Sequence, residues 1–303
     1  MMAPRLGPVR IGAVVLPEYS WPQTREIWTE LEDAGLDHAW SFDHHSWRTL
    51  QHEPWYDSLG VLSAVATHTE RIRLGTMVST PNFRHPVVLA KQVMTIDQLS
   101  DGRFIFGIGA GAKGNDARLL GGDCLTAPQR AARFAEFVAI SDEMLRNSTT
   151  TYDGDYFSAV DAKMVPGCVQ RPRVPFAIAA AGLGSMRLAA QYGQWWMTIG
   201  DANQPGGSTE EELWKLLARQ LTWLSTACEK AGRDFSEIGR LVHVSRIATS
   251  PYSSPDRFVH IVGRCRELGF TDVVVNYPRA EGIFSGKRTD FHGAVSAALS
   301  AFR

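Results

Sequence analysis

The sequence predicts a (β/α)₈ barrel, the TIM-barrel class, with a small β insertion before the fifth barrel strand. Eight short runs rich in apolar and β-branched residues are each followed by a stretch with helical or helix-capping features. Strands separated by helices pair in parallel, because each crossover returns the chain in the same direction. Eight such units in 303 residues fit one barrel. A doubly wound sheet, the competing fold, usually has fewer strands.

The eight strand candidates share a short length and a boundary at a turn residue; the first, for example, ends at Pro17. They cover residues 9–16, 38–43, 71–78, 103–109, 175–181, 195–199, 241–249 and 272–276.

The predicted helices carry apolar residues three and four positions apart. The clearest runs from Thr209 to Gly232, because Thr209 and Glu212 form a capping box and Gly232 is a typical stop. Other helices with defined limits cover residues 24–34, 58–67, 86–99 and 128–146.

Residues 147–174 interrupt the alternation. Asp153-Gly154, between Tyr152 and the pair Tyr156-Phe157, is a hairpin signal, which predicts the β insertion. No repeat, linker or low-complexity tract is visible, so we expect a single domain over residues 1–303.

The composition argues against several classes of partner. With 31 basic and 32 acidic residues the net charge is -1, and no basic stripe indicates a nucleic acid. The N-terminal apolar run of about six residues is too short for a signal peptide or a membrane span, so we expect a cytoplasmic protein. The four cysteines have no CxxC spacing and are expected to be structural thiols. The oligomeric state stays open, a homodimer included.

The string SFDHHSW (41–47) places Asp43, His44 and His45 at the end of the second strand. In such barrels the carboxyl ends of the strands form the active face. A metal site, a proton-transfer site and an inert polar loop are all open. Metal is disfavoured, because adjacent residues on an extended chain point in opposite directions and only the isolated His243 follows at another strand end. Proton transfer is plausible chemistry, since the carboxylate of Asp43 can fix the tautomer of His44.

Residues 109–114 match the dinucleotide pattern GxGxxG after the fourth strand. That pattern requires a helix to open inside it, whereas irregular chain is predicted up to about Pro128. We interpret Ala110 and Gly111 as part of a glycine turn that leaves room for a flat ligand. A nicotinamide-dependent dehydrogenase is the competing hypothesis, and Gly111→Val would test it.

The stretch AAAGLGSM (179–186) ends a strand and begins a helix through small residues. Backbone N–H groups near Gly182 and the hydroxyl of Ser185 would then point out of a helix N-terminus, which is a ready phosphate site. The alternative is a tight connection with Ser185 as the N-cap residue.

Several of these segments together resemble the luciferase-like monooxygenase superfamily. They are TPNFRHP (80–86), LAKQVMTIDQLSDGRFIFGIGAG (89–111), RVPFAIAAAGLGSMRLAAQYG (173–193) with the following WWMTIG, and SFDHHSW itself. Their order and spacing match over about residues 9–280. In particular the sequence is similar to the actinobacterial branch that uses the deazaflavin F420.

The resemblance implies roles for residues that bind the cofactor. Asp43 and His44 would face the isoalloxazine-like ring, with His44 as proton donor or acceptor. Met77 and Val78 would form the bulge after the third strand, where family members often have a non-prolyl cis peptide. The turn with Gly182 and Ser185 would bind the cofactor's phosphate.

We also expect Trp47, Trp55 and Phe83 to line a substrate pocket; the alternative is that each belongs to the hydrophobic core. One departure matters: sugar-phosphate dehydrogenases of this type have a glutamate shortly after the strand-four glycines, and this sequence has about Ala112 there. A glucose-6-phosphate dehydrogenase is therefore disfavoured.

The expected function is that of an oxidoreductase that uses reduced F420 for hydride transfer to or from a small organic substrate. An FMN-dependent monooxygenase and a flavin-binding protein without turnover are the alternatives.

Overall fold

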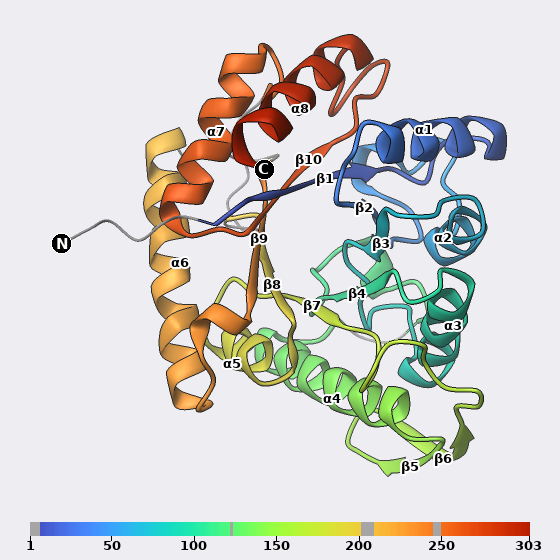
Figure 1. Cartoon of the computed structure of the whole chain (residues 1–303). Helices are drawn as coiled ribbons and strands as arrows, with labels where there is room; N and C mark the ends of the chain where they lie inside the picture. Colours follow the sequence, from blue (N-terminus) through green and yellow to red (C-terminus); the bar gives the residue numbers. More distant parts are fainter. Residues whose placement is uncertain (1–6, 122–123, 201–208, 245–249) are drawn as a thin grey trace. The chain divides into compact units, whose positions relative to one another are not determined.

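The computed structural model describes residues 7–121, 124–200, 209–244 and 250–303 (Figure 1). The barrel strands are β1 (Arg10–Val15), β2 (His38–Ser41), β3 (Arg73–Thr76), β4 (Phe104–Ile108), β7 (Phe176–Ala179), β8 (Trp195–Thr198), β9 (Gly239–His243) and β10 (Asp272–Asn276). They form a closed barrel in the order β1-β10-β9-β8-β7-β4-β3-β2. The predicted (β/α)₈ fold is confirmed. All eight strand candidates lie at these strands, although residues 245–249 of the seventh candidate are outside the described residues.

The helices are α1 (Trp21–Asp33), α2 (Ser58–Ala66), α3 (Pro86–Leu99), α4 (Ala127–Arg146), α5 (Leu183–Tyr192), α6 (Glu210–Lys230), α7 (Pro255–Leu268) and α8 (Arg288–Phe302). The predicted capping box of Thr209 and Glu212 begins α6, and a second one at Thr126 begins α4. In the described part of the chain, none of the helices combines the length and the apolar composition needed to cross a bilayer.

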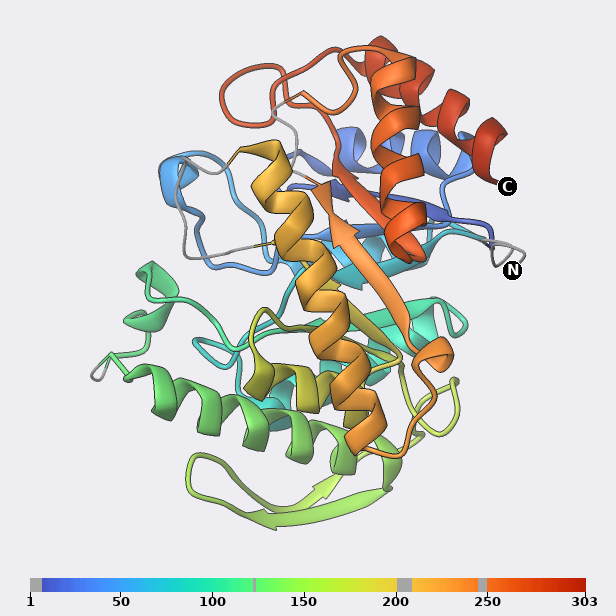
Figure 2. The same cartoon turned by 90° about the vertical axis from the view of Figure 1, so that its left-hand side faces the viewer.

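The predicted insertion is an antiparallel hairpin of β5 (Thr149–Asp153) and β6 (Ser158–Lys163). Figure 2 shows it alongside α4. Glu136 of α4 fixes the turn, because its carboxylate accepts hydrogen bonds from the backbone amides of Tyr156 and Phe157. A Cβ at Gly154 would lie 2.2 Å from an oxygen of Glu136, so only glycine lets the carboxylate approach this closely.

The chain divides into two compact units. One comprises Met1–Val15, Glu30–Ala39 and Ala180–Arg303, and the other comprises Leu16–Thr29 and Trp40–Ala179. In the second unit α2, α3 and α4 pack in succession (Figure 1). Single-domain organisation over residues 1–303 stays a prediction.

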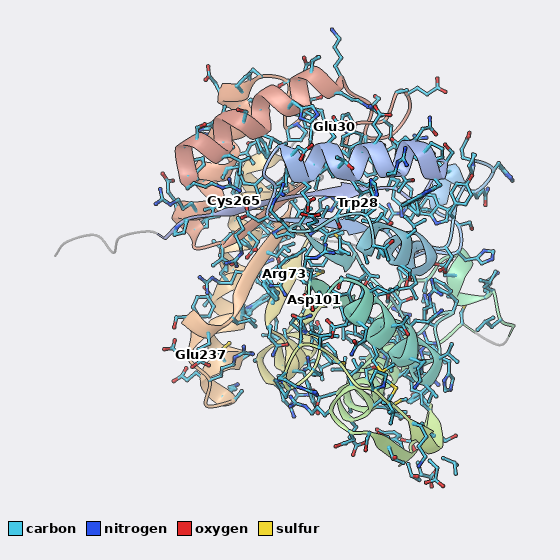
Figure 3. The ribbon with its side chains drawn as sticks, turned by 45° about the vertical axis from the view of Figure 1, so that its right-hand side comes forward. Trp28, Glu30, Arg73, Asp101, Glu237 and Cys265 are labelled. Carbon is cyan, nitrogen blue, oxygen red and sulfur yellow. The ribbon has the colours of Figure 1, made fainter. Side chains whose placement is uncertain are left out.

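All four cysteines are free thiols, and only Cys124 is exposed. Figure 3 marks Cys265 on α7, where the side chain is fully buried. Burial raises the pKa of the thiols of Cys168, Cys228 and Cys265. These three residues therefore remain protonated at neutral pH and serve as small apolar side chains.

A buried ionic network lies at the amino ends of the strands in the first unit. Both carboxylate oxygens of Asp272 accept hydrogen bonds at 2.6 Å from Arg10, and one lies 3.2 Å from Nε2 of His38. Trp195 also donates its indole N–H to this carboxylate. A Cβ at Gly12 would lie 1.9 Å from the imidazole of His38, so the network requires glycine at that position. Polar residues at this end of a barrel serve stability.

We expect Asp272→Asn to lower the free energy of unfolding by about 3 kcal/mol at pH 7, the cost of breaking a buried ion pair that is partly reached by solvent. Burial by itself would raise the pKa of Asp272, but the hydrogen bonds from His38 and Arg10 outweigh it and hold the pKa well below its usual range. A depressed pKa means that the carboxylate stabilises the fold above the unfolded value, about 3.9, and less as pH falls below it. Urea denaturation from pH 7 to pH 3 measures the difference between parent and variant.

That difference should shrink as the pH falls below about 4. Asp155→Asn is the matched control, because Asp155 is exposed and should change stability by no more than about 0.5 kcal/mol. A pH-independent difference between the parent and Asp272→Asn would show that charge is not what the network contributes.

Candidate active site

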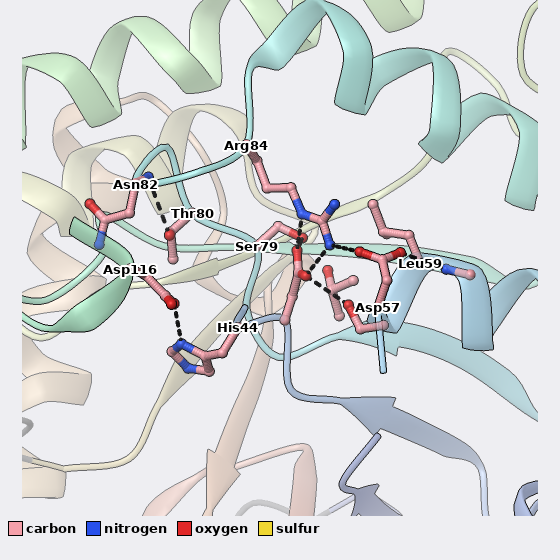
Figure 4. A network of polar contacts seen from close by, with 12 residues as sticks. His44, Asp57, Leu59, Ser79, Thr80, Asn82, Arg84 and Asp116 are labelled. Carbon is pink, nitrogen blue, oxygen red and sulfur yellow. Dashed lines mark hydrogen bonds and ion pairs between the residues drawn. The ribbon is translucent and has the colours of Figure 1, made fainter. Parts of the chain in front are cut away.

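His44 is paired with a carboxylate that lies 72 residues further along the chain (Figure 4). Its Nδ1 is 2.7 Å from Oδ2 of Asp116, in the short 3₁₀ turn η2 (Asn115–Ala117). Asp116 is buried, and its Oδ1 has no hydrogen-bond partner among the described residues. The imidazole is about one-third exposed. The pair thus combines an oriented imidazole with an unused buried acceptor, an arrangement suited to proton transfer.

The carboxylate of Asp43 binds a set of residues that does not include His44. The fully buried carboxylate accepts hydrogen bonds from the hydroxyls of Ser58 (2.7 Å) and Ser79 (2.5 Å) and from the guanidinium of Arg84 (2.6 Å). Figure 4 shows Ser79 and Arg84 of this cluster apart from His44, whose ring points toward Asp116. The expectation that Asp43 fixes the tautomer of His44 is therefore wrong, because adjacent residues of the extended chain point apart. Asp43 instead holds the chain that carries His44.

The guanidinium of Arg84 compensates the buried charge of Asp43. Arg84 also contacts Asp57, the N-cap residue of α2, at 2.5 Å. Burial would lower the pKa of Arg84, but the two carboxylates outweigh it and raise the pKa above its usual value. One cation thus ties the end of β2 to the beginnings of α2 and α3.

An aromatic cluster supports the backbone of His44. Trp47 is buried, packs against Phe42 with ring centroids 5.5 Å apart and stacks on Trp55 at 6.5 Å. Trp55 in turn donates its indole N–H to the carbonyl of His44 at 2.8 Å. Phe83 is half-buried, with the guanidinium of Arg84 over its ring at 4.7 Å. Their role as pocket walls stays a prediction.

The peptide between Met77 and Val78 is cis, as the resemblance implies. It lies directly after β3, and the backbone amide of Met77 donates to the carbonyl of Ser41 at the end of β2. A Cβ at Gly109 would lie 2.7 Å from a methyl group of Val78, so the chain after β4 also passes very close. Strands β2, β3 and β4 therefore meet at their carboxyl ends around this peptide.

As predicted, no helix begins within the glycine pattern after β4, residues 109–114. The next long helix, α4, begins only at Ala127. Gly111 has φ +75°, and a Cβ there would lie 2.6 Å from the side chain of Asn82, which donates to the carbonyl of Ala112. Arg133 of α4 donates to the other end of the same amide at 2.6 Å. Asn82 and Arg133 thus hold the turn that carries Ala110 and Gly111 in place. The substitution Gly111→Val would distort this turn irrespective of which ligand binds there.

The connection between β7 and α5 has the predicted form. Gly182 is the N-cap residue of α5, with no side-chain cap, so the alternative with Ser185 as N-cap is wrong. Ser185 lies in the first turn and donates its hydroxyl to the carbonyl of Gly182 at 3.0 Å. Gln220 holds the segment from α6, through contacts with the carbonyls of Ala181 and Gly200. The helix N-terminus is exposed, and a Cβ at Gly182 would meet no atom within 4 Å.

Sequence reasoning missed Asp116 and Arg84. Arg84 belongs to the segment TPNFRHP, but nothing in a single sequence links it to Asp43. Asp116 lies in a segment that the sequence predicts to be irregular, and its only signal was the predicted place of that segment at the carboxyl end of the fourth strand. For the metal hypothesis, no three His, Cys, Asp or Glu side chains converge anywhere in the part of the chain that the structure describes.

Residues 7–251 match the family described as luciferase-like monooxygenase. The F420-dependent glucose-6-phosphate dehydrogenase of Microbacterium testaceum is 31% identical over 246 residues, which cover 78% of this chain and 68% of that protein. The protein of the same description from Amycolatopsis mediterranei is 38% identical over 156 residues, 50% of this chain and 45% of the relative.

The fold is also shared with solved structures. An F420-dependent secondary alcohol dehydrogenase, in complex with an F420-acetone adduct, superimposes with a TM-score of 0.81 at 18% identity and covers 98% of this chain and 99% of that one. The family match extends over most of the sequence and includes the residues around His44, the cis peptide and the Gly182 turn. The chain belongs to the luciferase-like monooxygenase family.

Proposed function

We propose that the protein is an F420-dependent oxidoreductase that transfers a hydride between the deazaflavin and a small organic substrate, with His44 as the proton-transfer residue. The observation that carries this proposal is the pair of His44 and Asp116 at the carboxyl end of β2. A hydride carries two electrons and one proton. A carbonyl substrate that accepts a hydride must therefore also gain a proton on its oxygen, and an alcohol that gives up a hydride must lose one.

His44 suits that second transfer. With Nδ1 bonded to Asp116, the Nε2 edge of the ring is the one available to a ligand, and a third of the side chain is exposed. The carboxylate of Asp116 would stabilise the imidazolium whenever the ring holds the proton. His44 then gives the proton when the substrate is reduced and takes it when the substrate is oxidised.

The residues present fit a flavin-like cofactor. The buried Oδ1 of Asp116 is an acceptor that can receive an N–H or O–H group of a bound molecule. We assign the ring to the carboxyl ends of the strands, next to Met77, Val78, Ala110 and Gly111, and the phosphate to Gly182 and Ser185. When bound, F420 supplies the hydride chemistry; the protein orients the ring, excludes water and manages the proton.

The choice of F420 over FMN is supported by the relatives, since both curated proteins named above are described as F420-dependent. The glucose-6-phosphate activity in their names is a weaker guide, because the resemblance implies a glutamate at about position 112, where this chain has Ala112. The family description favours a second candidate, an FMN-dependent monooxygenase. A flavin-binding protein without turnover is the third candidate function.

Titration of the purified protein with F420 and with FMN tests the proposal, using quenching of the fluorescence of the nine tryptophans. We expect F420 to bind at least about tenfold more tightly than FMN, which corresponds to about 1.4 kcal/mol. Tighter binding of FMN would favour the monooxygenase. If neither F420 nor FMN binds, both the F420-dependent oxidoreductase and the FMN-dependent monooxygenase are refuted. Steady-state oxidation of reduced F420 by a panel of ketones and aldehydes then separates an enzyme from a protein that only binds.

A further inference from the structure

A second buried polar pair lies at the carboxyl ends of β9 and β10. Nε2 of His243 is 2.9 Å from Oδ1 of Asn276, and the two residues are 3% and 4% exposed. Each is the last residue of its strand. The carboxyl end of a barrel strand is where this fold places residues that act on ligands.

The strand register fixes where these side chains point. Asp272, Val274 and Asn276 alternate with Val273 and Val275 along β10, so the first three share one face. Leu241 is aligned with Asp272 and His243 with Val274, which places His243 on the same face of the sheet. Asp272 on this face contacts Arg10, His38 and Trp195, which belong to the amino ends of other strands. The common face is thus the barrel interior.

The two ends of this interior face differ in whether all their buried polar atoms have hydrogen-bond partners. At the amino end both oxygens of Asp272 accept hydrogen bonds. At the carboxyl end Oδ1 of Asn276 contacts Nε2 of His243, but Nδ2 of the same amide is buried and has no partner among the described residues. A buried N–H₂ group is rarely left unpaired, because it has lost its hydrogen bonds to water.

The pair with His243 also fixes the direction of the amide. Because an amide oxygen can only accept, Nε2 of His243 is the protonated nitrogen in this contact, and the N–H₂ group of Asn276 faces the other way. It is thus a preoriented donor at the carboxyl end of the barrel interior. An oxygen of a neutral organic molecule is the complementary group, since no cation or anion is needed to satisfy it.

We propose that the amide of Asn276, oriented by His243, is a binding subsite for the carbonyl or hydroxyl oxygen of an organic ligand. The inference deepens the proposed function and rests on it, because it takes that ligand to be the substrate. Asn276 is then a binding residue and His243 a positioning residue. Neither takes part in proton transfer, which the proposed function assigns to His44.

Two substitutions separate a binding role from a structural one. Asn276→Leu removes the whole amide at similar volume, and Asn276→Asp keeps an acceptor for His243 but removes the N–H₂ donor. Cyclohexanone serves as the carbonyl probe, and its binding in the presence of F420 is measured by saturation-transfer NMR, which needs no turnover. The affinity for F420 and the urea midpoint of the ligand-free protein are measured on the same samples.

We expect both variants to weaken cyclohexanone binding by about 10–100-fold, the usual effect of losing a buried hydrogen bond to a ligand. F420 affinity should stay within about twofold. The urea midpoint of Asn276→Leu should stay close to that of the parent, because the substitution removes the unpaired N–H₂ donor but leaves Nε2 of His243 without its acceptor. Unchanged cyclohexanone affinity, or no binding by a parent protein that does bind F420, would overturn the subsite. Failure of the parent to bind F420 would instead overturn the proposed function.

Discussion

Replacing His44 with alanine should lower turnover by about 10²–10⁴-fold, the usual contribution of a positioned acid–base group. The expectation follows from the 2.7 Å contact with Asp116, which orients the imidazole and leaves its Nε2 edge for a ligand. Affinity for F420 should stay within a few-fold, because a proton-transfer group acts mainly in the transition state. Turnover is measured as steady-state oxidation of reduced F420 with the substrate that the parent accepts.

His52→Ala is the matched control for this experiment. His52 is an exposed histidine in the segment that follows SFDHHSW, and we assign it no role, so turnover should equal that of the parent. Asp116→Asn adds a test of the pair itself. It keeps the shape of the side chain but removes the charge that stabilises the imidazolium, so it should lower kcat more than it raises KM. Parental turnover in His44→Ala would remove His44 from the mechanism.

The fold could be predicted because its signals are local. The barrel strands are short runs whose residues are mostly buried, such as Val273 to Val275 in β10. The hairpin of β5 and β6 was visible in Asp153-Gly154, and the beginning of α6 in Thr209 and Glu212. These features depend on residues within four positions of each other, where a single sequence carries the information.

The site could be predicted only in part, because its decisive contacts join distant residues. The sequence places Asp43 next to His44, yet 72 residues separate His44 from its actual partner, Asp116. Arg84 meets Asp43 across 41 residues, and His243 meets Asn276 across 33. Which side chains meet at the strand ends is decided by the closure of the barrel and by the course of the loops. No periodicity within a strand or helix encodes that choice.

Gly182→Asp should abolish cofactor binding while the protein remains folded. The N-terminus of α5 has no side-chain cap, so its backbone N–H groups are oriented outward and carry the positive end of the helix dipole. An aspartate at the N-cap position would accept hydrogen bonds from the amides of Gly184 or Ser185, the donors that we assign to the phosphate. Loss of two hydrogen bonds to a charged group, each of about 1.5–3 kcal/mol, predicts an affinity for F420 lower by more than about 100-fold.

The structure also indicates that this variant folds. Gly182 has φ -129°, which any residue adopts, and its Cβ position is open space. Because aspartate is a favoured N-cap residue, the thermal midpoint should not fall. Gly182→Ala is the matched control, since it adds only the Cβ and should bind F420 within a few-fold of the parent. Gly182→Asn also caps the helix but carries no charge, so its affinity should lie between those of the alanine and aspartate variants. If Gly182→Asp binds F420 and FMN as the parent does, the phosphate lies elsewhere, and the assignment of Gly182 and Ser185 is wrong.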